Sequence, residues 1–85
     1  MDLGRVLGET LMRVRRGAGV TQGEMARRLG LSRPTLNRLE SASQNVTLRT
    51  LAQLCRALGC EPGDLFRPGR VHWQRSPRPR RHRAR

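Results

Sequence analysis

Hydrophobic residues recur along the first 66 positions at spacings of three and four, which is the period of an amphipathic helix. The first series is Leu3, Leu7, Leu11 and Val14, and it predicts a helix that ends at the glycines around position 18. No run of alternating apolar and polar residues, the pattern of a strand, occurs before position 70. The folded part of the chain is therefore predicted to be all-α.

Two further helices are predicted from residues that favour helix ends. Thr21 and Glu24 have the spacing of a capping box at a helix start, and Gly30 permits the turn that ends this second helix. Ser32 is the expected cap of a third helix, with Pro34 in its first turn, where a missing N–H costs nothing. The side chains expected to face inward are Met25, Ala26, Leu29, Leu36 and Leu39. The pattern predicts two short helices joined by a tight turn.

A polar loop at 41–46 separates these helices from a fourth, which Thr47 caps and Gly59 ends. Its expected apolar stripe consists of Leu48, Leu51, Leu54, Cys55 and Leu58. Pro62 then opens a short fifth helix that ends at position 66. Five short helices within 66 residues predict one compact bundle with an aliphatic core.

The charged residues are unevenly distributed along the chain, which has 18 arginines, no lysine and a net charge of +12. Residues 1–66 contain ten arginines against six acids, a net +4, whereas residues 67–85 contain eight arginines and no acid, a net +8. The second segment has too little apolar surface to order itself. We therefore predict a folded domain at 1–66 and a basic tail at 67–85, in which residues 70–74 alternate like a short strand. Such a basic chain is expected to contact nucleic acid.

Several other classes of protein are disfavoured. No apolar run approaches the roughly 18 residues that span a membrane, and Asp2 is not followed by the apolar stretch of a signal peptide, so we expect a cytoplasmic protein. Cys55 and Cys60 have the spacing of neither a redox motif nor a zinc site, and we expect them to be buried apolar residues. His72 and His82 lack a ligand set, and no catalytic arrangement is recognisable. We expect no enzyme activity, metal or cofactor.

The order and spacing of these residues resemble the phage repressor and Cro-like helix-turn-helix proteins, known as the Xre family. The residues that carry the resemblance are Gly8, Arg15, Gly19, Thr21, Gln22, Glu24, Ala26, Gly30, Ser32, Thr35, Leu39, Glu40, Asn45, Leu48, Thr50, Leu51, Ala57, Leu58, Gly59, Asp64, Leu65 and Phe66. The resemblance implies a lambda-repressor-like domain whose third helix lies in the major groove of double-stranded DNA. The chain departs from the family after this helix, where Ala42 and Ser43 replace a usual Gly-Lys pair and Val46 replaces a usual proline.

The third helix supplies the candidates for base recognition. With its apolar residues facing the core, the residues left to face DNA are Arg33, Pro34, Asn37, Arg38 and Ser41. Arg33 and Arg38 are candidates for guanine O6 and N7, with a phosphate contact as the alternative for Arg33. Asn37 has the chemistry to bind adenine or a phosphate. Pro34 offers only apolar contact, and Thr35, which we expect to face partly inward, is a weaker candidate.

Other residues are expected to hold the backbone of DNA or the scaffold. Gln22 opens the second helix, where the resemblance implies a phosphate contact assisted by the helix N-terminus. Further phosphate candidates are Ser32, Ser43, Gln44 and Asn45. The resemblance also places Arg15 against Glu40, which ends the third helix. We predict a partly buried salt bridge that fixes this helix to the first.

The chain is therefore predicted to be a sequence-specific transcriptional regulator, a repressor or autorepressor that binds a palindromic operator as a homodimer. The expected dimer surface consists of Leu65, Phe66, Val71 and Trp73. One alternative is an antitoxin that binds a cognate toxin and represses its own operon, because some antitoxins of the family pair a strand such as 70–74 across the dimer. Trp73 would otherwise pack on the fifth helix or lie in a disordered tail. A second alternative is a non-specific nucleic-acid binder that acts through the arginine tail.

Overall fold

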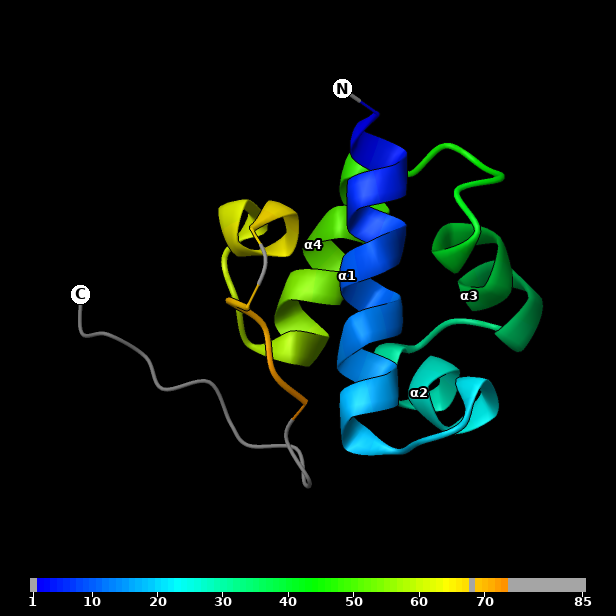
Figure 1. Cartoon of the computed structure of the whole chain (residues 1–85). Helices are drawn as coiled ribbons and strands as arrows, with labels where there is room; N and C mark the ends of the chain where they lie inside the picture. The colour runs from blue at the N-terminus through cyan, green and yellow to red at the C-terminus, as the bar shows by residue number, and fades with distance from the viewer. Residues whose placement is uncertain (1, 68, 74–85) are drawn as a thin grey trace.

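The computed structural model describes residues 2–67 and 69–73, and this part of the chain forms four α-helices and one 3-10 helix. They are α1 (Leu3–Ala18), α2 (Gln22–Leu29), α3 (Arg33–Glu40), α4 (Leu48–Leu58) and η1 (Pro62–Phe66). α1 runs through the middle of the molecule, with α2 and α3 on one side and α4 and η1 on the other (Figure 1). The all-α prediction is confirmed, although the fifth predicted helix is a 3-10 helix. None of the described helices is long and apolar enough to cross a membrane.

Side-chain caps begin the helices at the predicted positions. Each capping hydroxyl accepts a hydrogen bond from a backbone N–H three residues later, from Glu24 to Thr21 at 3.0 Å, from Thr35 to Ser32 at 3.2 Å and from Thr50 to Thr47 at 3.0 Å. These bonds satisfy N–H groups that have no partner within the helix. α1 has a cap that was not predicted, since the carboxylate of Asp2 accepts from the N–H of Arg5 at 3.2 Å.

The core lies where the apolar faces of the helices meet, with α1 packed against α3 and η1, and α2 packed against α3 and α4. Its buried hydrophobic side chains are Leu7, Leu11, Val14, Met25, Ala26, Leu29, Leu36, Leu39, Leu54, Cys55, Leu58, Leu65 and Val71. One predicted member, Leu48, is absent because it is 83% exposed, and Leu3 of the first helical series is 55% exposed. The placement of Leu48 on the apolar stripe was wrong. As the first residue of α4, Leu48 lies beyond the end of the core.

α1 and α3 approach each other closely at Gly8, a buried position on α1. A Cβ atom on this residue would lie 2.6 Å from the carbonyl oxygen of Leu39 and 2.7 Å from that of Glu40. Both oxygens belong to the backbone at the end of α3, which cannot rotate away as a side chain would. A glycine at this position therefore allows α3 to seat directly on α1.

The segment after η1 returns to the core. Val71 is 7% exposed within the same cluster as Leu65, and Trp73 is half-buried against that cluster. The guanidinium carbon of Arg28 on α2 lies 4.3 Å from the centroid of the Trp73 ring, a cation–π contact.

This placement bears on two predictions, the strand at 70–74 and the dimer surface. Residues 71–73 form no strand, and position 74 lies outside the described residues. Leu65 and Val71, which we predicted at a dimer surface, are buried in the core of their own chain at 0% and 7% exposure. Phe66 and Trp73 remain partly exposed. The basic tail is described only as far as Trp73.

The two cysteines are free. Cys55 is buried, as predicted, whereas Cys60, which was also predicted to be buried, is half-buried. Burial, together with the neighbouring Cys55, raises the pKa of the Cys60 thiol from its ordinary value of 9.0 to about 12. A thiol with such a pKa is protonated at neutral pH and is a poor nucleophile. No group of three or more His, Cys, Asp or Glu side chains with the geometry of a metal site occurs among the residues described here.

Candidate DNA-binding surface

α3 presents a polar face to solvent. Arg33, Asn37 and Arg38 are exposed, whereas Leu36 and Leu39 are buried against the rest of the domain. This division arises from the helical period, which places positions 33, 37 and 38 away from the face that bears the two leucines. The predicted outward and inward faces of α3 are therefore those of the structure.

The first turn of α3 combines capping residues with exposed ones. Ser32 accepts the Thr35 N–H and donates its own hydroxyl proton to Thr35 Oγ1 at 2.8 Å, so these two side chains pair with each other. Thr35 is half-buried, as predicted, and Pro34 is exposed. No hydrogen bond or ion pair to another described residue engages the guanidinium of Arg33. Arg33 therefore presents its full set of donors to solvent at the entry of α3.

Arg38 is oriented by the loop that follows α3. Its Nε donates to Gln44 Oε1 at 2.8 Å, and no hydrogen bond to another described residue engages the two terminal nitrogens of the guanidinium. The Arg38 guanidinium, held in this way, has lost part of its rotamer freedom before it binds a ligand. Sequence reasoning assigned Gln44 to a phosphate and did not identify this contact.

The hydroxyls of the loop turn back onto the end of α3. Ser41 Oγ and Ser43 Oγ approach each other at 3.0 Å and donate to the Arg38 carbonyl oxygen at 3.3 and 3.4 Å. Ala42 between them has a φ of 58°, in the left-handed region that favours glycine. Asn45 is exposed. Ser41 thus lies at the C-cap of α3 rather than within the helix, although it remains on the same surface.

The predicted ion pair between Arg15 and Glu40 is present and bidentate. Arg15 Nε donates to Glu40 Oε2 at 2.8 Å, and Arg15 Nη2 donates to Glu40 Oε1 at 3.1 Å. The side chains are 18% and 3% exposed, so the carboxylate is buried while the guanidinium retains some access to water. The hydrogen bonds to Glu40 and its negative charge raise the pKa of Arg15 above its ordinary value despite partial burial. The pair connects the first helix to the end of α3.

Gln22 joins this ion pair, which sequence reasoning did not predict. Its Nε2 donates to Glu40 Oε1 at 2.9 Å, and its Oε1 accepts a hydrogen bond from Asn37 Nδ2 at 3.5 Å. Gln22 lies at the start of α2 and Asn37 lies in the middle of α3, so no local spacing places them together. The first residue of α2 is therefore linked at once to the buried carboxylate and to the exposed face of α3.

The turn between α2 and α3 is braced from α4. Gln53 Nε2 donates to the carbonyl oxygens of Leu29 and Gly30, both at 2.9 Å. Gly30 has a φ of +75°, and a Cβ there would lie 2.9 Å from Gln53 Nε2. The only sequence signal for this contact is a glutamine beside the apolar stripe of the fourth predicted helix. The brace fixes the turn that sets the angle between α2 and α3.

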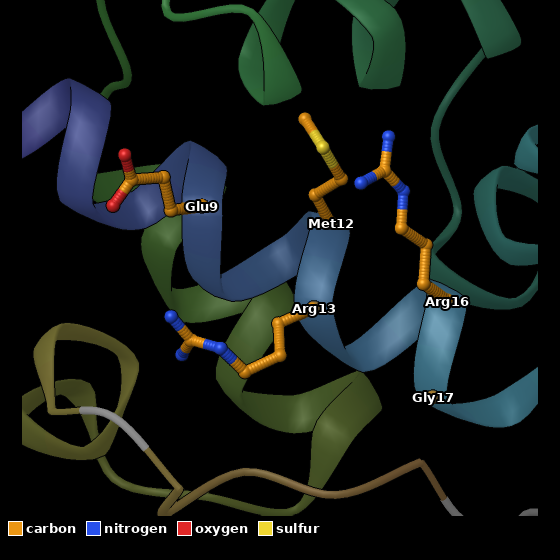
Figure 2. Close-up of a pocket in the computed structure, with 5 residues that line it drawn as sticks. All are labelled: Glu9, Met12, Arg13, Arg16 and Gly17. Atoms are coloured by element: carbon orange, nitrogen blue, oxygen red, sulfur yellow. The ribbon is translucent and has the colours of Figure 1, made fainter.

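A shallow depression lies along α1. It is lined by Glu9, Met12, Arg13, Arg16 and Gly17. Figure 2 shows Arg13 extending to one side of the helix and Met12 and Arg16 extending to the other. All of the lining residues come from one helix, and their polar groups do not converge on a common point. The exposed face of α3 is thus the better candidate for a binding surface.

A family model for a helix-turn-helix domain matches residues 6–68 of the chain. The chain belongs to the helix-turn-helix family. This membership agrees with the resemblance to Xre-type regulators, and it places the two helices of the motif at α2 and α3.

Relatives of this helix-turn-helix protein are transcription regulators by name. It is 38% identical over 68 residues to y4dJ, an HTH-type transcriptional regulator of Sinorhizobium fredii, with 80% of this chain and 88% of the relative covered. Among solved structures, the hypothetical transcription factor NHTF from Neisseria superposes with a TM-score of 0.69 at 31% identity, covering 80% of this chain and 78% of that one. The chain is therefore a DNA-binding transcriptional regulator of this class rather than an enzyme.

Two further structures show the same fold. The restriction-modification controller protein C.AhdI from Aeromonas hydrophila has a TM-score of 0.64 at 32% identity, covering 74% of this chain and 91% of that one. The clp gene regulator ClgR from Corynebacterium glutamicum has a TM-score of 0.64 at 34% identity, covering 75% and 83%. The match covers most of the length of each of these chains.

Proposed function

We propose that the chain is a cytoplasmic, sequence-specific regulator that binds double-stranded DNA with α3 in the major groove. The observation that carries this proposal is the division of α3 into a buried leucine face and an exposed face with Arg33, Asn37 and Arg38. The major groove accepts one α-helix, and the edges of guanine and adenine present the acceptors and donors that these side chains match. The chain has arginines and no lysine, which supports bidentate contacts to DNA, because a guanidinium offers paired donors whereas an ammonium acts as a point charge.

The residues have distinct proposed roles on DNA. Arg33 and Arg38 bind guanine O6 and N7, the second with its guanidinium already oriented by Gln44. Pro34 lies at the helix entry, where it offers apolar contact to a thymine methyl group or a sugar. Thr35 is paired with its own cap and contributes least.

Phosphate contacts are proposed for residues around this helix. The Gln22 side chain uses one of its two N–H groups on Glu40 and keeps the other for a phosphate at the start of α2, where the helix dipole favours an anion. The remaining phosphate ligands proposed are Ser32, Ser41, Ser43 and Asn45. Such contacts set the orientation of the domain without carrying sequence information.

We further propose that the regulator acts as a repressor and binds a palindromic operator as a homodimer, which would place two α3 helices about one helical turn of DNA apart. Of the four residues expected at a dimer surface, Phe66 and Trp73 remain available. The antitoxin alternative rested on residues 44–48 and on a strand at 70–74. Because Val71 packs into its own core, no observation favours that alternative over a regulator without a toxin partner.

Replacing Arg33 with alanine should abolish the base preference at one operator position, since a bidentate contact supplies about 1–3 kcal/mol of discrimination. The wild-type chain first defines its site by selection from a randomised duplex library. The variant is then measured against duplexes substituted one base pair at a time. Arg56→Ala, which removes an exposed arginine of α4, serves as the control. An equal loss of affinity for all sequences would make Arg33 a phosphate ligand instead.

Deleting residues 75–85 should lower the affinity for DNA and reduce its dependence on salt. This segment carries six arginines and no acid. Each phosphate contact that is lost reduces the slope of log K against log salt concentration by about 0.9. The slope is measured on the selected duplex for the wild type, the deletion and a full-length variant with glutamine in place of the six arginines. If all three slopes agree, the tail makes no phosphate contact.

A further inference from the structure

Four side chains form one hydrogen-bonded chain from the interior of the domain to the surface of α3. Arg15 donates to Glu40, Gln22 donates to Glu40, and Asn37 donates to Gln22, with donor–acceptor distances of 2.8, 2.9 and 3.5 Å. The exposure of the residues rises along this chain, from the buried Glu40 carboxylate to the exposed Asn37 carboxamide. We refer to these residues, Arg15, Glu40, Gln22 and Asn37, as the relay.

The buried carboxylate of Glu40 determines how the amide groups of Gln22 and Asn37 are oriented. The Glu40 side chain is 3% exposed, and its charge is held by Arg15. An ionised carboxylate only accepts hydrogen bonds, so the carboxamide of Gln22 must turn its NH2 group toward Glu40 and its oxygen away. That oxygen only accepts, so Asn37 must turn its own NH2 group toward Gln22. Reversing either amide would place two acceptors, or two donors, against each other.

This orientation determines which hydrogen-bonding groups Asn37 presents at the surface of α3. Asn37 uses one N–H on Gln22 and keeps its second N–H and its Oδ1. One donor beside one acceptor matches the major-groove edge of adenine, which offers the N7 acceptor and the N6 donor. Guanine offers two acceptors at its N7 and O6, and the exposed edges of cytosine and thymine each offer a single hydrogen-bonding group, so none of these satisfies both atoms of the amide.

We propose that Gln22 and Glu40 are positioning residues that hold the Asn37 carboxamide in the orientation that selects adenine at one position of the operator. This inference rests on the proposed binding of α3 in the major groove. Gln22 therefore has two roles, since it contacts the DNA backbone and also fixes the orientation of a base-reading side chain that lies 15 positions further along the sequence.

The experiment separates these two roles by measuring base preference and overall affinity independently. A duplex site is selected from a randomised library with the wild-type chain, and binding to all single-base-pair variants of that site is then measured. Asn37→Asp identifies the position that Asn37 reads, because a carboxylate accepts from cytosine N4 and cannot donate to adenine N7. We expect adenine to be replaced by cytosine at this one position. A change at no position, or at several, would overturn the assignment of Asn37.

Gln22→Met removes the relay while retaining the length of the side chain. We expect the preference for adenine at the Asn37 position to fall from about tenfold or more to less than about threefold, since the amide is then free to rotate. Glu40→Gln should weaken the same preference, because an amide at position 40 no longer imposes the direction of Gln22. Ser43→Ala removes a proposed phosphate ligand outside the relay, and it should lower affinity equally for all sequences.

Two results would contradict the inference, and they are distinguishable. If Gln22→Met lowers affinity but retains the wild-type preference for adenine, Gln22 is only a phosphate ligand and the relay has no role in specificity. If the wild-type chain enriches no sequence from the library, the proposed function fails first and the relay fails with it. Circular dichroism of each variant establishes that the fold is retained before binding is measured.

Discussion

Replacing Gly8 with alanine is expected to cost about 3 kcal/mol of unfolding free energy, one of the two largest effects predicted for this protein. The added Cβ would lie 2.6 and 2.7 Å from the backbone carbonyl oxygens of Leu39 and Glu40, distances that require α1 and α3 to move apart. For a domain of this size, such a loss lowers the melting temperature by roughly 12–24 °C. Thermal unfolding followed by circular dichroism at 222 nm measures the change.

The same helix supplies a matched control. Gly17 is also helical, but a Cβ on it would meet no atom within 4 Å. Gly17→Ala should therefore raise stability by about 0.5–1 kcal/mol, because alanine loses less conformational freedom than glycine when the helix forms. Equal effects of the two substitutions would show that helix propensity, and not the contact between α1 and α3, determines the outcome at position 8. Weakened DNA binding by a folded Gly8→Ala chain would further indicate that α3 is displaced.

The second large effect is expected from Arg15→Met. This substitution retains much of the side-chain volume but leaves the Glu40 carboxylate, which is 3% exposed, without its charged partner. Breaking a buried pair by removing one member costs about 3 kcal/mol or slightly more, mainly because the remaining charge is stranded. Urea unfolding at neutral pH measures the difference. We also expect weaker DNA binding, since the pair holds the end of α3 against α1.

A second ion pair on α1 provides the comparison. Arg5 and Glu9 lie 3.7 Å apart with side chains 71% and 61% exposed, so Arg5→Met should cost no more than about 0.5 kcal/mol. The double variant Arg15→Met with Glu40→Leu should be more stable than Arg15→Met alone, because no charge is then left buried. A double variant that is less stable than either single variant would indicate that the two residues contribute independently rather than as a pair.

These two contacts explain how a small domain holds a short recognition helix. α3 has eight residues, a length at which an isolated helix is marginal in water. The close approach at Gly8 and the ion pair to Arg15 connect it to α1, and its leucines are buried in the core. The Gln53 brace fixes the turn before it. The side chains that we propose to face DNA therefore rest on a helix that is stabilised largely by tertiary contacts.

Local sequence signals were sufficient for most of the helix boundaries. The hydroxyl caps at Thr21, Ser32 and Thr47 lie where the sequence predicted them, because a cap involves only residues three positions apart. The inner faces of α2 and α3 were also predicted, since the helical period alone assigns residues to faces. Leu48 shows the limit of this reasoning. Its spacing fits the stripe of α4, yet whether the core extends to it depends on neighbouring elements.

The sequence by itself determined the four α-helices, the caps at Thr21, Ser32 and Thr47, the face of α3 that carries Arg33, Asn37 and Arg38, and membership of the helix-turn-helix family. Only the tertiary structure decided which distant groups meet. Leu65 and Val71 are in the core, and Gln22 lies between Glu40 and Asn37. The physical reason is the range of the interactions. Periodicity and capping act within one helix turn, whereas burial, hydrogen-bond direction and backbone approach depend on chain segments brought together by packing.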